Sequence, residues 1–292
     1  MEKIIFDLHQ DLLPFILDKK LNAKDFFKIN VVSVFTLIKW KSEFIENYDI
    51  NFVLRAIETY REFAEKNNFL IVEKASDLKS VMDSKRKGFI IDLECCSVIT
   101  DKYILKALFN LGVRVFTLTW NYSNQIASSC GDIRENGLTK FGKEIVNEIA
   151  EIGGIVDLAH SGRKTFYDVY KMKVPFFVSH TGILKNPKNK RNISFIEMDL
   201  IKNRKSIAGI ALGSLFFERK INKEEVIKKI KALLRKYPEN ISLGSDLFGL
   251  SERNIIEGFT SYEQIRESLK DLPDSFLYLN AYNFFIKHLP EK

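Results

Sequence analysis

Cysteine is scarce in this chain. Among 292 residues only Cys95, Cys96 and Cys130 occur, an odd number of which two are adjacent. Such a set gives no disulfide framework, and a cysteine pair without a second pair is a poor zinc-finger signal. The simplest interpretation is a reduced protein, and we expect a cytoplasmic location.

Long hydrophobic runs are also absent. No stretch of the sequence approaches the roughly 18–20 apolar residues that a membrane helix requires. The first twenty residues carry Asp7, His9 and Asp11 where a secretion signal would be apolar, and they contain no small-residue cleavage site. We therefore expect neither a secretion signal nor a membrane partner.

The sequence also contains no internal repeat, low-complexity tract or Pro/Gly/Ser-rich linker. Apolar residues make up 46% of the chain, which is enough for a sizeable core. We expect one domain over residues 1–292, with helices at 262–289 following the last strand.

Eight short apolar runs alternate with helical patterns along the chain. The runs are Ile4–Leu8, Val31–Leu37, Phe89–Leu93, Val113–Thr119, Gly154–Leu158, Pro175–Ser179, Ile207–Leu212 and Ile241–Gly244. Helical spacing is clearest at Val53–Lys66, Lys140–Ile152, Ser194–Asn203 and Lys223–Lys236. Near-continuous apolar strands that alternate with helices indicate a parallel sheet, and eight units over about 250 residues predict an α/β fold of the (β/α)8 TIM barrel type. A doubly wound open sheet is the alternative, but it normally has a glycine-rich loop after the first strand, where this chain has HQDLLP.

The net charge of +7 raises the question of nucleic acid. The densest basic stretches are Lys185–Arg191 and Lys85–Lys87, and both lie between apolar runs, where loops are expected. No aromatic stacking motif accompanies them. We interpret them as solvated surface and expect no nucleic-acid partner.

Polar side chains that could bind a metal lie in or close to the ends of five apolar runs. They are His9 with Asp11, Glu94, His160, His180 and Asp246. In a barrel the carboxyl ends of all strands converge on one mouth, so these side chains would meet.

His, Asp and Glu suit Zn²⁺ or a similar divalent ion. The spacing of His9 and Asp11 on an extended strand lets both reach one ion, Glu94 could bridge two ions, and His160 and His180 would complete the second. Such a pair activates a water, and Asp246 is placed to move its proton. Each residue taken alone has an ordinary alternative, such as a hydrogen-bonded core histidine, a buried ion-pair partner for Glu94 or a helix N-cap for Asp246.

Several stretches resemble the membrane (renal-type) dipeptidase family, peptidase family M19 of the amidohydrolase superfamily. The most specific is GLTKFGKEIVNEIAEIGGIVDLAHSG, and it is accompanied in family order by DLHQDLLP, GVRVFTLTWNYSNQIASSC, PFFVSHTG, KRNIS, ISLGSDLFG and NAYNFF. The resemblance implies a (β/α)8 barrel of the metal-dependent hydrolase type with two zinc ions.

Residue by residue, the resemblance implies that His9 and Asp11 bind the first zinc, that Glu94 bridges, and that His160 and His180 bind the second. It also implies that Asp246 is the catalytic aspartate. Arg191 would bind the carboxylate of the substrate. The alternative for Arg191 is that it simply belongs to the basic run Lys185–Arg191.

The chain departs from the family pattern at three places. Trp120 stands where family members commonly have a substrate-binding histidine, and an indole donates one hydrogen bond but carries no charge. Cys95–Cys96 replaces the usual glycine after Glu94, and Phe248 replaces a second aspartate after Asp246. The ligand positions are kept, so the substrate is the open question.

The sequence thus predicts a metallo-dipeptidase that cleaves dipeptides with a metal-bound hydroxide at a binuclear zinc site. Alternatives are hydrolysis of a lactone or cyclic amide on the same metal pair, which Trp120 favours, or a non-catalytic metal-binding homologue. A homodimer is left open.

Overall fold

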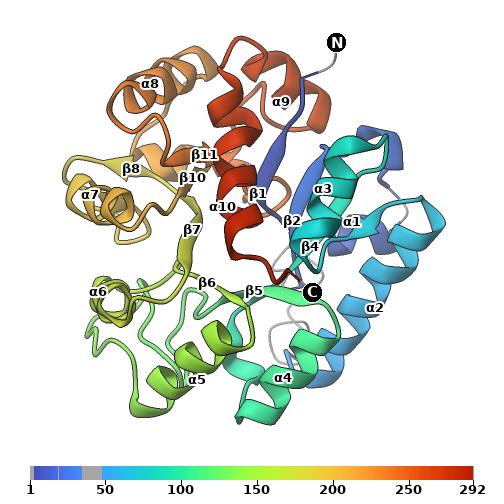
Figure 1. Ribbon diagram of the computed structural model, residues 1–292. Helices are drawn as coiled ribbons and strands as arrows, with labels where there is room; N and C mark the ends of the chain where they lie inside the picture. Colours follow the sequence, from blue (N-terminus) through green and yellow to red (C-terminus); the bar gives the residue numbers. More distant parts are fainter. Residues whose placement is uncertain (1–2, 19, 35–47, 292) are drawn as a thin grey trace.

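The computed structural model describes residues 3–18, 20–34 and 48–291, and its centre is a closed barrel of eight parallel strands (Figure 1). The barrel strands are β1 (Phe6–Gln10), β2 (Ile29–Ser33), β4 (Gly88–Glu94), β5 (Val113–Thr117), β6 (Ile155–Asp157), β7 (Phe176–Thr181), β10 (Ala208–Ile210) and β11 (Ile241–Leu243). Neighbours follow the order β2-β1-β11-β10-β7-β6-β5-β4, and pairing of β2 with β4 closes the ring. The predicted (β/α)8 barrel is therefore confirmed.

All eight predicted strands are present, with boundaries that differ by a few residues. The first strand continues through His9 to Gln10, so His9 lies inside the strand rather than after it. Residues 35–37 of the second predicted strand lie outside the described residues. The sequence did not predict β3 (Leu70–Ile71), which adds to β4, or the pair β8 (Ile183–Leu184) and β9 (Ile193–Ser194). Each of these strands has only two residues, too few for a periodic signal.

Helices surround the barrel, as Figure 1 shows. They are α1 (Leu13–Leu17), α2 (Ile50–Lys66), α3 (Ala75–Asp83), α4 (Lys102–Asn110), α5 (Lys140–Glu151), α6 (Arg163–Met172), α7 (Phe195–Asn203), α8 (Lys223–Lys236), α9 (Tyr262–Leu269) and α10 (Asn280–His288), the last preceded by a π-helical turn at Ser275–Leu279. Side-chain caps explain several of the starts. Thr139 accepts a hydrogen bond from the Gly142 amide at the start of α5, and Ser194 and Asn222 form capping boxes at α7 and α8.

The last helix closes one end of the barrel. Phe285 of α10 packs on Phe6, with ring centroids 5.2 Å apart, and Phe284 packs on Phe177 at 5.6 Å. Phe6 and Phe177 lie at the amino-terminal ends of β1 and β7, so α10 covers the amino-terminal end. The opposite, carboxyl-terminal mouth is left for the polar side chains.

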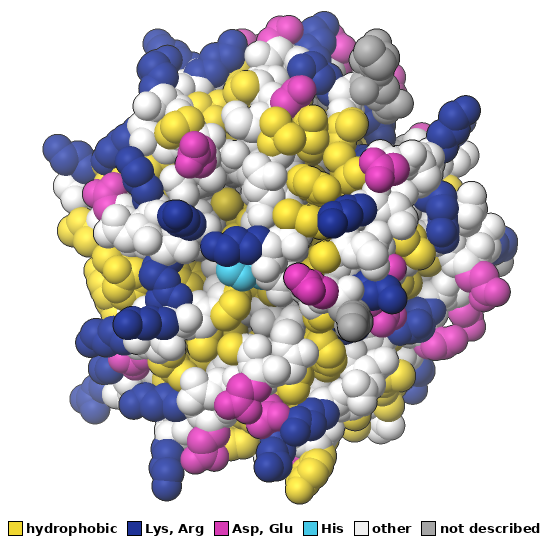
Figure 2. Space-filling view, in the orientation of Figure 1, with side chains coloured by type: hydrophobic (Ala, Val, Ile, Leu, Met, Phe, Trp, Pro, Cys, Tyr) yellow, Lys and Arg dark blue, Asp and Glu magenta, His cyan; other side chains and the backbone are white. Residues whose placement is uncertain are grey.

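The face of the molecule drawn in Figure 2 carries Lys and Arg side chains around its periphery, with Asp and Glu among them. None of the helices in the described ranges is long and apolar enough to cross a membrane.

The barrel backbone packs closely between β7, β10 and the residue after β11. A Cβ atom placed on Gly209 would lie 1.8 Å from the Ser179 carbonyl oxygen, and one on Gly244 would lie 1.9 Å from the same oxygen. These two glycines therefore let three backbones approach more closely than any side chain would permit.

We expect Gly209→Ala to lower the free energy of unfolding by about 1–3 kcal/mol, because the added methyl group meets backbone that cannot move aside. Urea unfolding followed by circular dichroism measures the change. Ser76→Ala, at an exposed helical position, is the control and should stay within about 0.5 kcal/mol of the wild type. Equal stability of Gly209→Ala and wild type would show that the barrel is less tightly packed here than described.

Candidate metal centre

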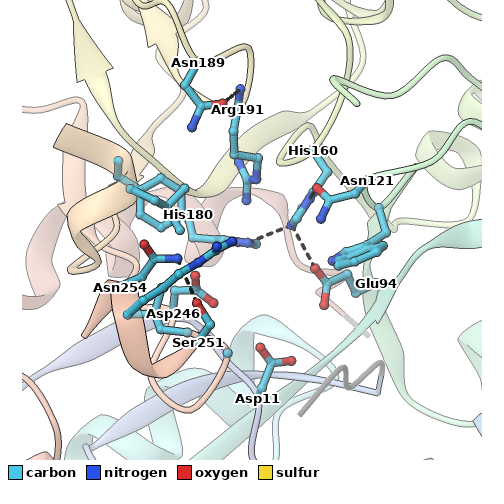
Figure 3. Close-up of a pocket in the computed structure, with 16 residues that line it drawn as sticks. Asp11, Glu94, Asn121, His160, His180, Asn189, Arg191, Asp246, Ser251 and Asn254 are labelled. Carbon is cyan, nitrogen blue, oxygen red and sulfur yellow. Dashed lines mark hydrogen bonds and ion pairs between the residues drawn. The ribbon is translucent and has the colours of Figure 1, made fainter. Parts of the chain in front are cut away.

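The six metal-binding and catalytic candidates meet at the carboxyl-terminal mouth of the barrel. His9 lies in β1, Glu94 is the last residue of β4 and His180 lies in β7. Asp11, His160 and Asp246 follow β1, β6 and β11 within three residues. Figure 3 shows the labelled members of this group around one pocket. The parallel barrel thus brings together residues up to 237 positions apart in the sequence, although what each residue does stays a prediction.

Glu94 occupies the centre of the group. Its Oε1 lies 3.2 Å from His160 Nε2, and its Oε2 lies 3.7 Å from His9 Nε2. His160 Nε2 is in turn 3.1 Å from His180 Nε2, and His9 Nε2 is 3.8 Å from Asp11 Oδ2. The two carboxylate oxygens of Glu94 therefore face different histidines, which is the arrangement that a bridging carboxylate needs.

The backbone is strained where the chain leaves these strands. His160 and Asp246 have φ values of 61° and 57°, and Cys95, directly after Glu94, has a φ of 67°. A left-handed conformation is unfavourable for residues other than glycine and is found mainly where the surrounding structure enforces it, often at functional sites. Here it turns the chain sharply within the mouth. No helix begins at Asp246 within the described chain, so the N-cap alternative does not apply.

A second tier of carboxylates, which the sequence analysis missed, lies beneath the first. Asp157 accepts hydrogen bonds from the amides of Ala159 and Ser179, the neighbours of His160 and His180, at 2.9 and 2.8 Å. Asp7 accepts from the Ser245 amide, next to Asp246, at 2.7 Å. These two buried aspartates therefore position three of the candidate residues through their backbones.

Asp92 is the third member of this tier. Its Oδ2 lies 3.8 Å from His9 Nδ1, and each of its oxygens lies 3.0 Å from Thr117 Oγ1, which has one hydroxyl hydrogen to donate. At 3.8 Å the two groups are too far apart for a hydrogen bond, so Asp92 and His9 interact through their charges. The sequence does carry a signal for this tier, because Asp-Leu precedes the predicted ligand in DLH, DLE and DLAH.

Burial dominates the electrostatics of the site. It raises the pKa of Glu94 well above its ordinary value and that of Asp246 to about 7. Burial also raises the pKa of Asp92, to about 8, with the nearby charge of Asp157 adding to the effect. For His160 and His180, burial and the positive charges of Arg191 and His9 lower the pKa well below 6.5, so both rings are neutral. Neutral imidazole is the form that binds a metal.

His9 shows most clearly that the site suits a cation. Burial alone would lower its pKa, but the charges of Glu94, Asp11 and Asp246 raise it well above the usual range. Both of its ring nitrogens are buried and have no hydrogen-bond partner among the residues that the structure describes. Buried polar atoms without partners are costly. A divalent ion among these groups would pair with the nitrogen and neutralise the carboxylates, so the residues present fit a metal centre.

The pocket above this centre has a volume of about 480 Å³ and is lined by both Arg191 and Trp120. Arg191 is half-buried, whereas the basic run before it was expected to lie in solvent. Its Nη2 is buried and has no hydrogen-bond partner in the described part of the chain, and its guanidinium lies 5.5 Å from the Phe216 ring. Trp120 is half-buried, with its ring 5.8 Å from that of His160. Both predicted substrate-binding residues therefore line this pocket, and their roles stay predictions.

Comparison with known proteins places these features in context. The profile of the family described as membrane dipeptidase (peptidase family M19) matches residues 6–276. An uncharacterized dipeptidase of Schizosaccharomyces pombe, C965.12, is 25% identical over 165 residues, which are 53% of this chain and 40% of that protein. The chain thus spans less than half the length of this curated relative.

Two solved structures share the whole fold. A metallo peptidase from Rhodobacter sphaeroides, crystallised with a phosphinate mimic of the dipeptide L-Ala-D-Ala, superposes with a TM-score of 0.83 at 17% identity, covering 99% of this chain and 100% of the other. The probable dipeptidase PvdM from Pseudomonas aeruginosa gives a TM-score of 0.84 at 13% identity, covering 98% and 96%. At these identities the likeness establishes the fold.

A count of bound metal tests the predicted ligand set. After reloading with Zn²⁺ and desalting, wild-type protein should retain about two ions per chain, the number that a bridged pair requires. His160→Ala and His180→Ala should each retain about one or fewer, as measured by mass spectrometry of the metal. His288→Ala removes the one histidine outside the site and is the matched control. Wild-type retention by His160→Ala would remove His160 from the ligand set.

Proposed function

The chain belongs to the membrane dipeptidase family, peptidase family M19, and from that premise we propose that it is a metal-dependent dipeptidase using two divalent ions, with zinc the first expectation. The observation that carries the proposal is the position of Glu94 between His9 and His160, beneath a pocket that also contains Asp246 and Arg191. A metal centre, an acid and a cation in one small pocket provide the parts that peptide hydrolysis of a short, free-ended substrate requires.

We assign the residues that would hold the ions as the resemblance to the family implies. His9 and Asp11 would hold the first, His160 and His180 the second, and Glu94 would contact both. When bound, such ions polarise a carbonyl and lower the pKa of an attacking water to about 7.

Asp246 would transfer a proton from the attacking water to the leaving amine. It lies in the mouth close enough for its charge to raise the pKa of His9, and it lines the same pocket as Glu94 and His180. A cation bound nearby would favour its ionised form, which can accept a proton from water and donate it to the leaving amine.

Arg191 would bind the free carboxylate of the dipeptide. Its buried Nη2 lacks a partner within the described residues, and a guanidinium fork binds a carboxylate with two parallel hydrogen bonds. Because that carboxylate marks the end of a peptide, this contact would restrict the enzyme to substrates that end one residue after the scissile bond.

Trp120 favours a second candidate, hydrolysis of a lactone or cyclic amide on the same metal pair. It lines the pocket beside His160, where family members commonly place a further histidine. An indole offers one neutral hydrogen-bond donor to a developing oxyanion. Assays of dipeptides and of lactones therefore decide between the two reactions.

The deciding assay measures turnover of a dipeptide panel and a set of simple lactones by product release. Metal-free protein should be inactive, and protein reloaded with Zn²⁺ or Mn²⁺ should hydrolyse dipeptides. Asp246→Asn should retain both ions yet lose about 100-fold or more in kcat, since it cannot move the proton. Full activity of verified metal-free protein, or turnover of lactones alone, would contradict the proposal.

The role of Arg191 has its own test. Arg191→Met should lower kcat/KM for dipeptides by about 100-fold, because an ionic hydrogen-bonded pair is lost, and Arg191→Lys should lose less. Dipeptide amides, which lack the carboxylate, should be poor substrates of both the wild type and Arg191→Met. If Arg191→Met hydrolyses dipeptides as well as the wild type does, then Arg191 belongs to the surface run after all.

A further inference from the structure

The pocket wall carries more positive charge than a single carboxylate requires. Apart from the predicted ligands and Asp246, its described lining residues include two arginines and three asparagines but no acid. One of the arginines is Arg191. The other is Arg253, which neither the motifs nor the proposed mechanism uses.

The loop after β11 holds Arg253 in place at the rim. Arg253 lies in a 3₁₀ turn, Glu252–Asn254, which begins after Ser251. Asn254 Nδ2 donates to Ser251 Oγ at 2.9 Å, and the Asn254 amide donates to the Ser251 carbonyl at 2.8 Å. Gly213 leaves room for the side chain of Leu250, since a Cβ there would lie 2.5 Å from Leu250 Cδ2. These contacts close the turn locally and pack Leu250 against Gly213.

The two arginines lie at different depths of the pocket. Arg191 Nη2 is buried, and its guanidinium lies 5.5 Å from the Phe216 ring, so this cation lies inside the pocket. Arg253 is exposed. Its side chain makes no ion pair or hydrogen bond within the described part of the chain. Figure 3 shows its neighbours Ser251 and Asn254 on the same side of the pocket as Asp246, apart from Asn121 and Glu94.

We propose that this enzyme selects dipeptides with an acidic side chain, and that Arg253 binds the side-chain carboxylate while Arg191 binds the terminal one. The inference rests on the proposed dipeptidase function and names the substrate class of that same site. A pocket of about 480 Å³ accommodates a dipeptide with such a side chain. Two cations set at different depths match two carboxylates of one small molecule, and a charge-assisted pair is stronger than a neutral contact.

The test compares substrates that differ only in charge. The metal-loaded enzyme is assayed for kcat/KM on Glu-Ala against Gln-Ala, and on Ala-Glu against Ala-Gln. We expect the acidic member of at least one pair to be preferred about tenfold, the lower end for a hydrogen bond to a charged group, because Arg253 is exposed. Raising the salt concentration should reduce the preference.

Variants assign the preference to Arg253. Arg253→Gln should bring the ratio of acidic to amide substrate close to one, and Arg253→Lys should retain part of it. Arg235→Gln, an exposed arginine on α8, changes the net charge equally and should keep the wild-type ratio. A general loss of folding would lower both rates and leave the ratio unchanged.

The possible failures are distinguishable. Efficient hydrolysis of all four dipeptides without acidic preference, or a preference that survives in Arg253→Gln, overturns this inference and leaves the dipeptidase proposal standing. If none of the four is hydrolysed by metal-loaded wild type, the proposed function fails and the inference fails with it.

Discussion

The concentration of buried carboxylates around His9 is the constraint on which the rest of this structure depends. Asp11, Asp92, Glu94 and Asp246 all lie within the mouth of the barrel and are buried. Burial of ionised carboxylates without partners is strongly unfavourable, and it raises the pKa of Asp92, Glu94 and Asp246. Divalent cations would remove that penalty, so metal binding and the stability of this end of the barrel should be coupled.

The barrel places its aromatic packing against α10 at one end and its buried carboxylates at the other. Phe284 and Phe285 of α10 seal the amino-terminal end, which leaves the carboxyl ends of the strands for the ligands. Asp7 and Asp157 then bind the backbone next to Asp246, His160 and His180 and hold these side chains in place. The left-handed backbone at His160 and Asp246 is unfavourable in isolation, and these hydrogen bonds help to maintain it.

Much of this could be predicted from the sequence because the barrel strands are continuous apolar runs and histidine is rare. The second tier was missed although Asp-Leu precedes the predicted ligand in DLH, DLE and DLAH, because Asp7, Asp92 and Asp157 lie within strands and the groups that they bind cannot be identified from the sequence. Only the pairing of neighbouring strands shows which backbone amides lie near each aspartate. For example, Asp157 on β6 accepts a hydrogen bond from the Ser179 amide on β7. Arg253 was not singled out either, since an exposed arginine in a turn has no sequence pattern, and only the pocket shows that it lies at this site. The residues that gather at the strand ends could therefore be predicted from the sequence. Which loop residues line the pocket could not.

The most direct test of the account is a crystal structure of zinc-loaded protein with anomalous data collected at the zinc edge. Two anomalous peaks, about 3.5–4 Å apart, should lie on either side of the Glu94 carboxylate. One peak should be ligated by His9 and Asp11 and the other by His160 and His180. The absence of zinc from this mouth, or a single ion that leaves His160 and His180 hydrogen-bonded to each other, would contradict the binuclear centre on which the proposed function rests.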